Sequence, residues 1–250
     1  MSDLPSRSRP QSASDPWTYA RQRNQSARSA AEIERSFAHS VRFYRALLGD
    51  HLPSDREARV LDLPCGEGMM VYALRQLGYR NVLGYDLDRQ RLATGQKLGL
   101  PLHPGDVFEV LEACGDGSLG CVLAMDFVEH IEKPEVIELL SLVHAKLAPG
   151  GVFLARTPCA DSPQGPTHVF NDFTHKWGAT SGVLRWLLEA AGFAGVSVIG
   201  EHPQWAMSWG WLRVPLFAAS KALANGYLRL LGLSPYPIWS GSMWGIGRKP

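Results

Sequence analysis

The chain has 250 residues, 45% of them apolar, and its 25 Lys and Arg residues nearly balance 24 Asp and Glu residues. This length and composition suffice for one α/β domain with additions or for two small domains. The near-zero net charge gives no reason to expect nucleic-acid binding. No apolar run reaches the roughly 18 residues of a membrane span, and no secretory signal is recognisable. The four cysteines lack metal-type spacing. We therefore expect a soluble, cytoplasmic protein.

The N-terminal region divides into a polar segment and a helix. Residues 1–28 are rich in Ser, Arg, Pro and Gln, a composition that predicts disorder. A helix is predicted from Ser29, because Ser29 and Glu32 form a capping-box pattern, and Gly49 is expected to end it. One face of this helix is apolar and carries Ile33, Phe37, Val41, Tyr44 and Leu48. We assign residues 29–250 to a single folded domain.

From residue 59 onward, short apolar runs alternate with helical patterns. This alternation predicts βαβ units and a parallel sheet with helices on both faces. Two further strands are expected at 195–200 and 242–248. The first four runs are 60–63, 81–85, 120–125 and 151–156, and the helical patterns are 68–77, 88–98, 134–147 and 180–191.

Residues 203–241 interrupt the alternation and hold four of the eight tryptophans. We interpret them as an aromatic-rich helical insertion whose amphipathic helix starts near Pro215. Its apolar stripe needs burial against the protein's own sheet, a second subunit or a membrane surface. We expect a lid over the functional site first, a homodimer contact second and peripheral membrane contact third. The stripe consists of Leu212, Leu216, Ala219, Leu223, Tyr227 and Leu230.

The run Val60-Leu61-Asp62-Leu63-Pro64-Cys65-Gly66-Glu67-Gly68 joins an apolar strand to a helix through a turn with two glycines. Glycines let a backbone approach a ligand closely, and open α/β sheets bind ligands at this end of their strands. Asp86 ends the second strand, where a carboxylate can accept both hydroxyls of an adenosine ribose. Asp106 follows the third strand region and can meet an adenine amino group, with Val107 against the ring. A dinucleotide site would need a third glycine, but position 71 is Val.

Taken in order, these motifs resemble the class I S-adenosylmethionine-dependent methyltransferases over residues 57–200. The family's first motif reads Val-Leu-Asp-x-Gly-x-Gly-x-Gly, and Val60–Gly68 departs from it only at Pro64. Residues 123–131 and 147–151 resemble the family's fourth-strand motif and the turn before its fifth strand. The resemblance implies a Rossmann-like seven-stranded sheet and S-adenosylmethionine as cofactor. The residues expected to hold this cofactor are Asp62, Pro64, Cys65, Gly66, Gly68, Asp86, Leu87, Asp106, Val107, Met125 and Asp126.

Candidate catalytic residues follow the fourth and fifth strands. His130 lies in the first group, and His168, Asp172 and His175 lie between aromatic residues in the second. Histidine can accept a proton near neutral pH, and an adjacent carboxylate can orient it. We rank His175 above His168, because Asp172 is three residues away. We assign no metal site, although these groups also suit a divalent metal. The alternative to a catalytic role is a polar loop whose side chains form hydrogen bonds only within the turns of that loop.

A second, shorter resemblance concerns the acceptor. The pattern Asp172-x-Thr174-His175, followed by residues 184–193, resembles methyltransferases of bacterial surface-glycan pathways. It implies O-methylation of a sugar or glycan-linked acceptor. Methylation of a lipid-like or aromatic small molecule is the alternative, since aromatic faces suit either acceptor. A non-catalytic partner subunit that binds the cofactor also stays open, because Pro64 replaces a motif glycine.

Overall fold

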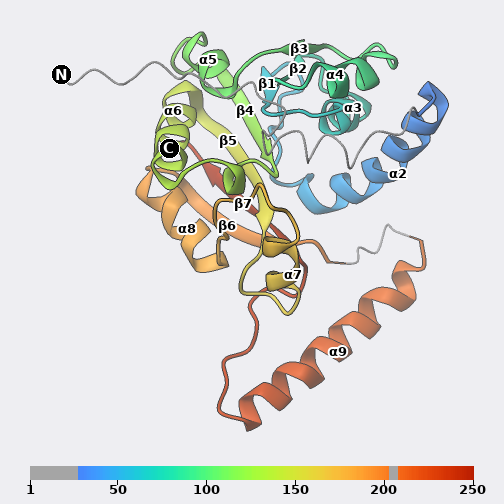
Figure 1. Ribbon diagram of the computed structural model, residues 1–250, viewed down its shortest axis with the longest axis vertical. Helices are drawn as coiled ribbons and strands as arrows, with labels where there is room; N and C mark the ends of the chain where they lie inside the picture. Colours follow the sequence, from blue (N-terminus) through green and yellow to red (C-terminus); the bar gives the residue numbers. More distant parts are fainter. Residues whose placement is uncertain (1–27, 203–207) are drawn as a thin grey trace.

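The computed structural model of the protein describes residues 28–202 and 208–250. The predicted disorder of residues 1–28 therefore lies outside the described residues, apart from Arg28. Seven strands form one sheet in the order β3-β2-β1-β4-β5-β7-β6 (Figure 1). The strands are β1 (Val60–Asp62), β2 (Val82–Asp86), β3 (Leu102–Pro104), β4 (Leu119–Met125), β5 (Leu147–Pro158), β6 (Ala194–Gly200) and β7 (Ser242–Arg248).

Strands β1 to β5 pair in parallel, and β7 runs antiparallel between β5 and β6. This confirms the predicted Rossmann-like seven-stranded sheet. The carboxyl ends of the five parallel strands consequently meet at one edge of the sheet. The loops after β1, β2, β4 and β5 all leave from this edge, so candidate residues distant in sequence can lie close together.

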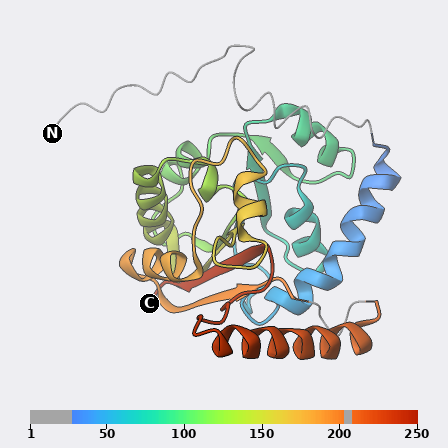
Figure 2. The ribbon, with the colours of Figure 1, turned by 60° about the horizontal axis from the view of Figure 1, so that its bottom comes forward.

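Helices cover both faces of the sheet, as expected (Figures 1 and 2). Helices α2, α3 and α4 pack on one face, and α5, α6 and α8 on the other. A short helix, α7, follows β5 and had not been predicted. The helices are α2 (Ala30–Leu48), α3 (Met69–Gln76), α4 (Arg89–Gln96), α5 (Val107–Glu112), α6 (Lys133–Lys146), α7 (Gly165–Phe170), α8 (Ser181–Ala190) and α9 (Gly210–Leu230), with a 3₁₀ turn, η1, at Val128–His130.

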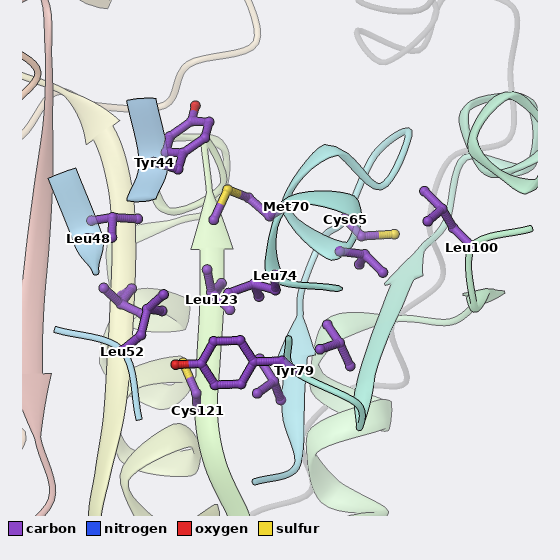
Figure 3. Close-up of a cluster of buried hydrophobic side chains, with 14 of the residues drawn as sticks. Tyr44, Leu48, Leu52, Cys65, Met70, Leu74, Tyr79, Leu100, Cys121 and Leu123 are labelled. Carbon is purple, nitrogen blue, oxygen red and sulfur yellow. The ribbon is translucent and has the colours of Figure 1, made fainter. Parts of the chain in front are cut away.

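Helix α2 begins at the predicted capping box, in which Ser29 and Glu32 each bond the other's backbone N–H. Gly49 caps its end. Its buried residues join a cluster that also includes Met70 and Leu74 from α3 and Leu123 from β4 (Figure 3). This packing fixes α2 against the same face of the sheet as α3, the helix that follows the loop after β1. Of the predicted stripe, Val41 alone is only half-buried.

Helix α9 differs from its prediction in two ways. It begins at Gly210 rather than near Pro215, because backbone hydrogen bonds to the Trp209 carbonyl already wind the chain there. Pro215 therefore lies inside the helix. The apolar stripe is also exposed, with Leu223 at 80% and Leu230 at 87%, so it does not pack on the protein's own sheet. Within the described ranges, no helix is long and apolar enough to cross a membrane.

Candidate active site

The backbone of the loop after β1 can lie close to a ligand. Gly66 and Gly68 both adopt positive φ, at 56° and 83°. A Cβ at Gly66 would lie 2.5 Å from the Arg91 guanidinium, which would have to shift, and the positive φ would strain the backbone of any other residue there. The Leu63–Pro64 peptide is cis, and the next residue, Cys65, donates its N–H to the Tyr85 carbonyl at 2.9 Å. The loop that contains Pro64 is thus hydrogen-bonded to β2.

Two carboxylates lie at the ends of β1 and β2. The Gly66 N–H donates to Oδ2 of Asp86 at 2.7 Å, and the Asp88 N–H donates to Oδ1 at 2.7 Å. These bonds hold the Asp86 carboxylate in a fixed orientation. Asp62 is 1% exposed, and its Oδ1 has no hydrogen-bond partner. Burial, together with the charge of Asp86, raises the pKa of Asp62 above its ordinary value.

The third predicted acid also lies at this edge. Asp106 is mostly buried and caps α5 by accepting the N–H groups of Phe108 and Glu109. Val107 is buried beside it, whereas Leu87, after Asp86, is 53% exposed. Acidic groups at the ends of β2 and β3, with apolar neighbours, suit the ribose and adenine of an adenosyl group. The buried Asp62 oxygen and the closely packed glycines also fit such a ligand.

A charged network crosses the sheet edge from β4 to β7. Asp126, which has φ 48°, accepts two hydrogen bonds from Arg156 at 2.5 Å. Arg156 also donates to Glu201 at 2.6 and 3.0 Å, and the Trp244 indole N–H donates to Glu201 at 2.9 Å. The sequence analysis included Asp126 and its half-buried neighbour Met125 but missed Arg156 and Glu201. Both could have been noticed in the sequence, because Arg156 ends the apolar run 151–156 and Glu201 directly follows the run 195–200.

Glu129 is a carboxyl group buried in the turn after β4. It is 1% exposed, and neither carboxylate oxygen has a hydrogen-bond partner. Burial, reinforced by the charge of Asp126, raises its pKa well above the ordinary value. The Thr157 hydroxyl favours its charged form without reaching hydrogen-bond geometry. A buried carboxyl group without partners is costly, which indicates a function beyond packing.

His130 is oriented by a short relay. Thr174 donates its hydroxyl to Oδ1 of Asp172 at 2.7 Å, and its oxygen lies 2.9 Å from Nδ1 of His130. A hydroxyl has one hydrogen and a carboxylate accepts only, so His130 donates its Nδ1–H to Thr174 and carries its lone pair on Nε2. Burial and the neighbouring His175 lower the pKa of His130. The predicted carboxylate is therefore present, but it orients His130 through Thr174.

His175 lies against His130, with ring centroids 4.7 Å apart. Its Nδ1 is 2.6 Å from the Val169 carbonyl, an acceptor, so its lone pair is also on Nε2. Two bonds fix this loop to the turn after β4: the Lys176 N–H donates to the Glu129 carbonyl, and the Trp177 indole N–H donates to the Val128 carbonyl. The loops after β4 and β5 thus present one histidine cluster.

His168 lies elsewhere. It is exposed on α7, and its ring packs on Gly241, where a Cβ would come within 2.2 Å of Nε2. A positive charge on its ring would lower the pKa of Glu201, so the ring lies near that carboxylate. The structure therefore brings His130, Asp172 and His175 together but places His168 beside the charged network. An unpredicted helix, α7, produces this separation by turning the chain between His168 and Asp172.

Fold and site together define an α/β enzyme suited to an adenosyl ligand at the carboxyl edge of its sheet. A model of the methyltransferase domain family matches residues 19–215, which is more than half of the chain. The chain belongs to this family.

Solved structures share the fold. An S-adenosylmethionine-dependent methyltransferase of Archaeoglobus fulgidus is 21% identical, with 89% of this chain and 100% of that chain covered and a TM-score of 0.64. One from Mesorhizobium loti is 20% identical, with 82% and 97% covered and a TM-score of 0.54. A curated relative, a phosphatidylglycerol–prolipoprotein diacylglyceryl transferase of Caulobacter sp. strain K31, is 32% identical over 135 residues. That match spans 53% of this chain and 41% of the relative.

Proposed function

We propose that this S-adenosylmethionine-dependent methyltransferase methylates a hydroxyl oxygen of a sugar or glycan-linked acceptor. The cluster of Glu129, His130 and His175 would promote loss of the hydroxyl proton. The observation that carries the proposal is the pair of histidines, each engaged through Nδ1 and each with its lone pair on Nε2. They lie in the loops after β4 and β5, at the same sheet edge as the loop of Gly66 and Gly68.

When bound, S-adenosylmethionine supplies a methyl group already activated on a sulfonium. The chain's own residues need to orient both partners and remove the acceptor proton. Asp86 would hold the ribose hydroxyls, and Asp106 and Val107 would hold the adenine. The loop from Pro64 to Gly68 would carry the methionine part.

The histidine cluster favours a hydroxyl acceptor, because a hydroxyl is a weak nucleophile until its proton is removed. Burial and the nearby His175 lower the pKa of His130, so His130 is neutral and able to accept a proton at physiological pH. The Asp172–Thr174 relay would hold the ring in place and stabilise the charge that it gains.

Two aromatic side chains support a sugar. Phe170 and Phe173 are 83% and 84% exposed on either side of Asp172. Large apolar side chains that remain so exposed in the loop of a candidate site suit stacking on the apolar face of a ligand.

An acceptor screen with methyl-labelled S-adenosylmethionine tests this proposal. We expect label as a methyl ether on hydroxyl-bearing sugars or glycan-linked acceptors, and none on matched amino compounds. His175→Ala should lower turnover by about 10²–10⁴-fold without changing cofactor affinity. Label found only on nitrogen, or unchanged turnover of the variant, would contradict it.

A lipid-like acceptor is the second candidate, favoured by the exposed apolar residues of α9. Adding lipid-linked and free forms of the same sugar to the screen separates the two. Transfer to both forms supports the sugar as the recognised part, whereas transfer to lipids without sugar supports the second candidate.

A further inference from the structure

We propose that Glu129, His130 and His175 bind a first-row divalent transition-metal ion. This inference deepens the proposed function and rests on it for the metal's role, but not for its binding. One potential ligand atom from each of the three residues lies within 4.8 Å of the other two. Ligand atoms at 2.0–2.2 Å from a tetrahedral ion are roughly 3.4 Å from one another. The three side chains would therefore have to move by about 1 Å to bind the ion.

The buried carboxylate is the first independent support. Glu129 is 1% exposed, and both of its oxygens lack hydrogen-bond partners. A cation that replaces the proton of this carboxyl group would give both oxygens a partner and remove the penalty of burying them unpaired.

The hydrogen bonds behind the histidines are the second support. Metal-bound histidines usually donate the other ring N–H to a carbonyl or carboxylate, which fixes the tautomer and the ring. His175 donates to the Val169 carbonyl, and His130 is linked to Asp172 through Thr174. Both rings therefore carry the Nε2 lone pair that a metal requires.

The ligand types define the class of ion. Two imidazoles and one carboxylate suit Zn²⁺, Co²⁺, Fe²⁺ or Mn²⁺, whereas Mg²⁺ and Ca²⁺ prefer oxygen ligands. Three protein ligands leave coordination positions open to an acceptor oxygen. With the metal bound, His130 and His175 would be ligands and no longer bases. The metal would instead lower the pKa of a bound hydroxyl, so that its proton leaves to solvent.

Cobalt titration of the chelator-treated full-length protein tests the site without cofactor or acceptor. We expect saturable visible absorption bands from one equivalent of Co²⁺, and no displacement by Mg²⁺. His175→Ala and Glu129→Gln should each weaken Co²⁺ binding at least 100-fold. Thr174→Val, which leaves all three ligands in place, should weaken it about 10–100-fold. His168→Ala is the matched control and should bind Co²⁺ as the wild type does.

Circular dichroism identifies any variant that fails to fold. The Co²⁺ titration is then carried out with Thr174→Val or His175→Gln in place of that variant. Absence of saturable Co²⁺ binding by the wild type, or equal binding by folded His175→Ala, overturns the metal site. Hydroxyl methylation that persists after chelation would leave the proposed function standing and remove the metal's role in it. Co²⁺ binding without any hydroxyl methylation would leave the site standing and overturn the proposed function.

A separate observation concerns α9, whose outward side we call the apolar face: Leu212, Leu216, Leu223, Tyr227 and Leu230. Each of these residues is at least 39% exposed. The opposite side is less exposed and includes Phe217, whose ring lies 5.0 Å from His202. In Figure 1, α9 stands off the end of the molecule where α7 lies, and Figure 2 shows it running along that side. The helix thus has little contact with the rest of the described structure and presents the apolar face outward.

We infer that the apolar face docks on an anionic membrane surface. Charge favours this occupant, because no Asp or Glu follows Glu201 in the sequence. Exposed Arg213 and Arg229 flank the apolar face, whereas Lys221 lies on the opposite side near His202. A two-fold contact with a second copy would bring the arginines together without acidic partners on either helix. Exposed Trp209 and Trp211 suit the membrane–water interface, where aromatic rings are enriched.

Vesicle sedimentation tests this surface. The wild type should bind vesicles containing anionic phosphatidylglycerol, bind phosphatidylcholine vesicles weakly, and dissociate as salt rises. Leu223→Glu should lower the bound fraction at least tenfold, and the side chain is exposed enough for the fold to tolerate the change. Ala222→Glu adds the same charge to an exposed position outside the apolar face and should have a far smaller effect. Equal binding by the two variants overturns the inference, and so does a dimer that Leu223→Glu dissociates in the absence of vesicle binding.

Discussion

The backbone N–H of Gly66 donates to the carboxylate of Asp86 across 2.7 Å, joining the loops that follow β1 and β2. The substitution Asp86→Ala removes both this hydrogen bond and the carboxylate predicted to accept the ribose hydroxyls. We expect S-adenosylmethionine to bind more weakly by about 1.5–3 kcal/mol, the scale of hydrogen bonds to charged groups. Calorimetric titration measures the change, with Asp88→Ala as a control for the helix cap alone. Unchanged affinity in Asp86→Ala would remove Asp86 from the cofactor site.

The Asp172–Thr174–His130 relay predicts a matched pair of variants. Thr174→Val keeps the shape of the side chain but removes the hydroxyl, whereas Thr174→Ser keeps the hydroxyl. We expect turnover to fall at least tenfold in Thr174→Val and to stay within about threefold in Thr174→Ser, with cofactor affinity unchanged in both. Steady-state kinetics and calorimetry provide the two readouts. Unchanged turnover in Thr174→Val would show that the hydroxyl relay does not contribute and that Thr174 serves packing only.

The Arg156–Glu201 pair predicts a pH-dependent contribution to stability. Burial alone would raise the pKa of Glu201, but its hydrogen bonds and charge interaction with Arg156 outweigh burial and hold the pKa below the ordinary 4.5. A depressed pKa stabilises the fold above the unfolded value, and this contribution is lost as pH falls through the folded value.

Glu201→Gln should therefore lower the free energy of unfolding by about 2 kcal/mol at pH 7. The difference from the wild type should shrink as pH falls below about 4.5. Denaturant unfolding at several pH values measures it. A difference that stays constant down to pH 3 would show that the carboxylate's charge contributes nothing.

A deletion of α9 should affect methyl transfer without affecting the stability of the fold. Only Gly210 is buried among its residues, and β6 pairs directly with β7. Replacing residues 208–236 with a short Gly/Ser bridge should therefore change the free energy of unfolding by no more than about 1 kcal/mol and leave cofactor binding intact. If α9 docks the enzyme on a membrane, transfer to a lipid-linked acceptor in anionic vesicles should be lost, whereas transfer to the free sugar should remain. Loss of transfer to the free sugar by a folded deletion variant would show that α9 contributes to catalysis itself.

Much of the fold could be predicted, because local patterns determine it. The Ser29–Glu32 capping box, the alternating apolar runs and the glycines after β1 are short-range signals, and each corresponds to the element expected. The start of α9 was wrong, since Pro215 was interpreted as a first-turn residue although the helix begins at Gly210. Pro215 instead lies inside the helix, where it lacks the N–H for one backbone hydrogen bond, and no short-range pattern marked the true first turn at Gly210.

The site was less accessible to sequence analysis. Arg156 and Glu201 meet only because β7 lies between β5 and β6, and no pattern in the sequence reports that strand order. Likewise, the burial of Glu129 and the link from Thr174 to His130 depend on how two loops pack together. The residue types were recognised, but their partners were not, because partners are set by long-range packing.

The position of β7 also constrains how the chain can assemble. β6 joins the sheet only through β7, yet residues 201–241 separate these two neighbours. Closing a loop of this length rather than a turn of five residues costs roughly 2 kcal/mol of chain entropy. Until β7 arrives, β5 is an open edge strand and β6 has no partner. During synthesis this half-built sheet exists while α9 is being made, so a chaperone has its longest opportunity to act there.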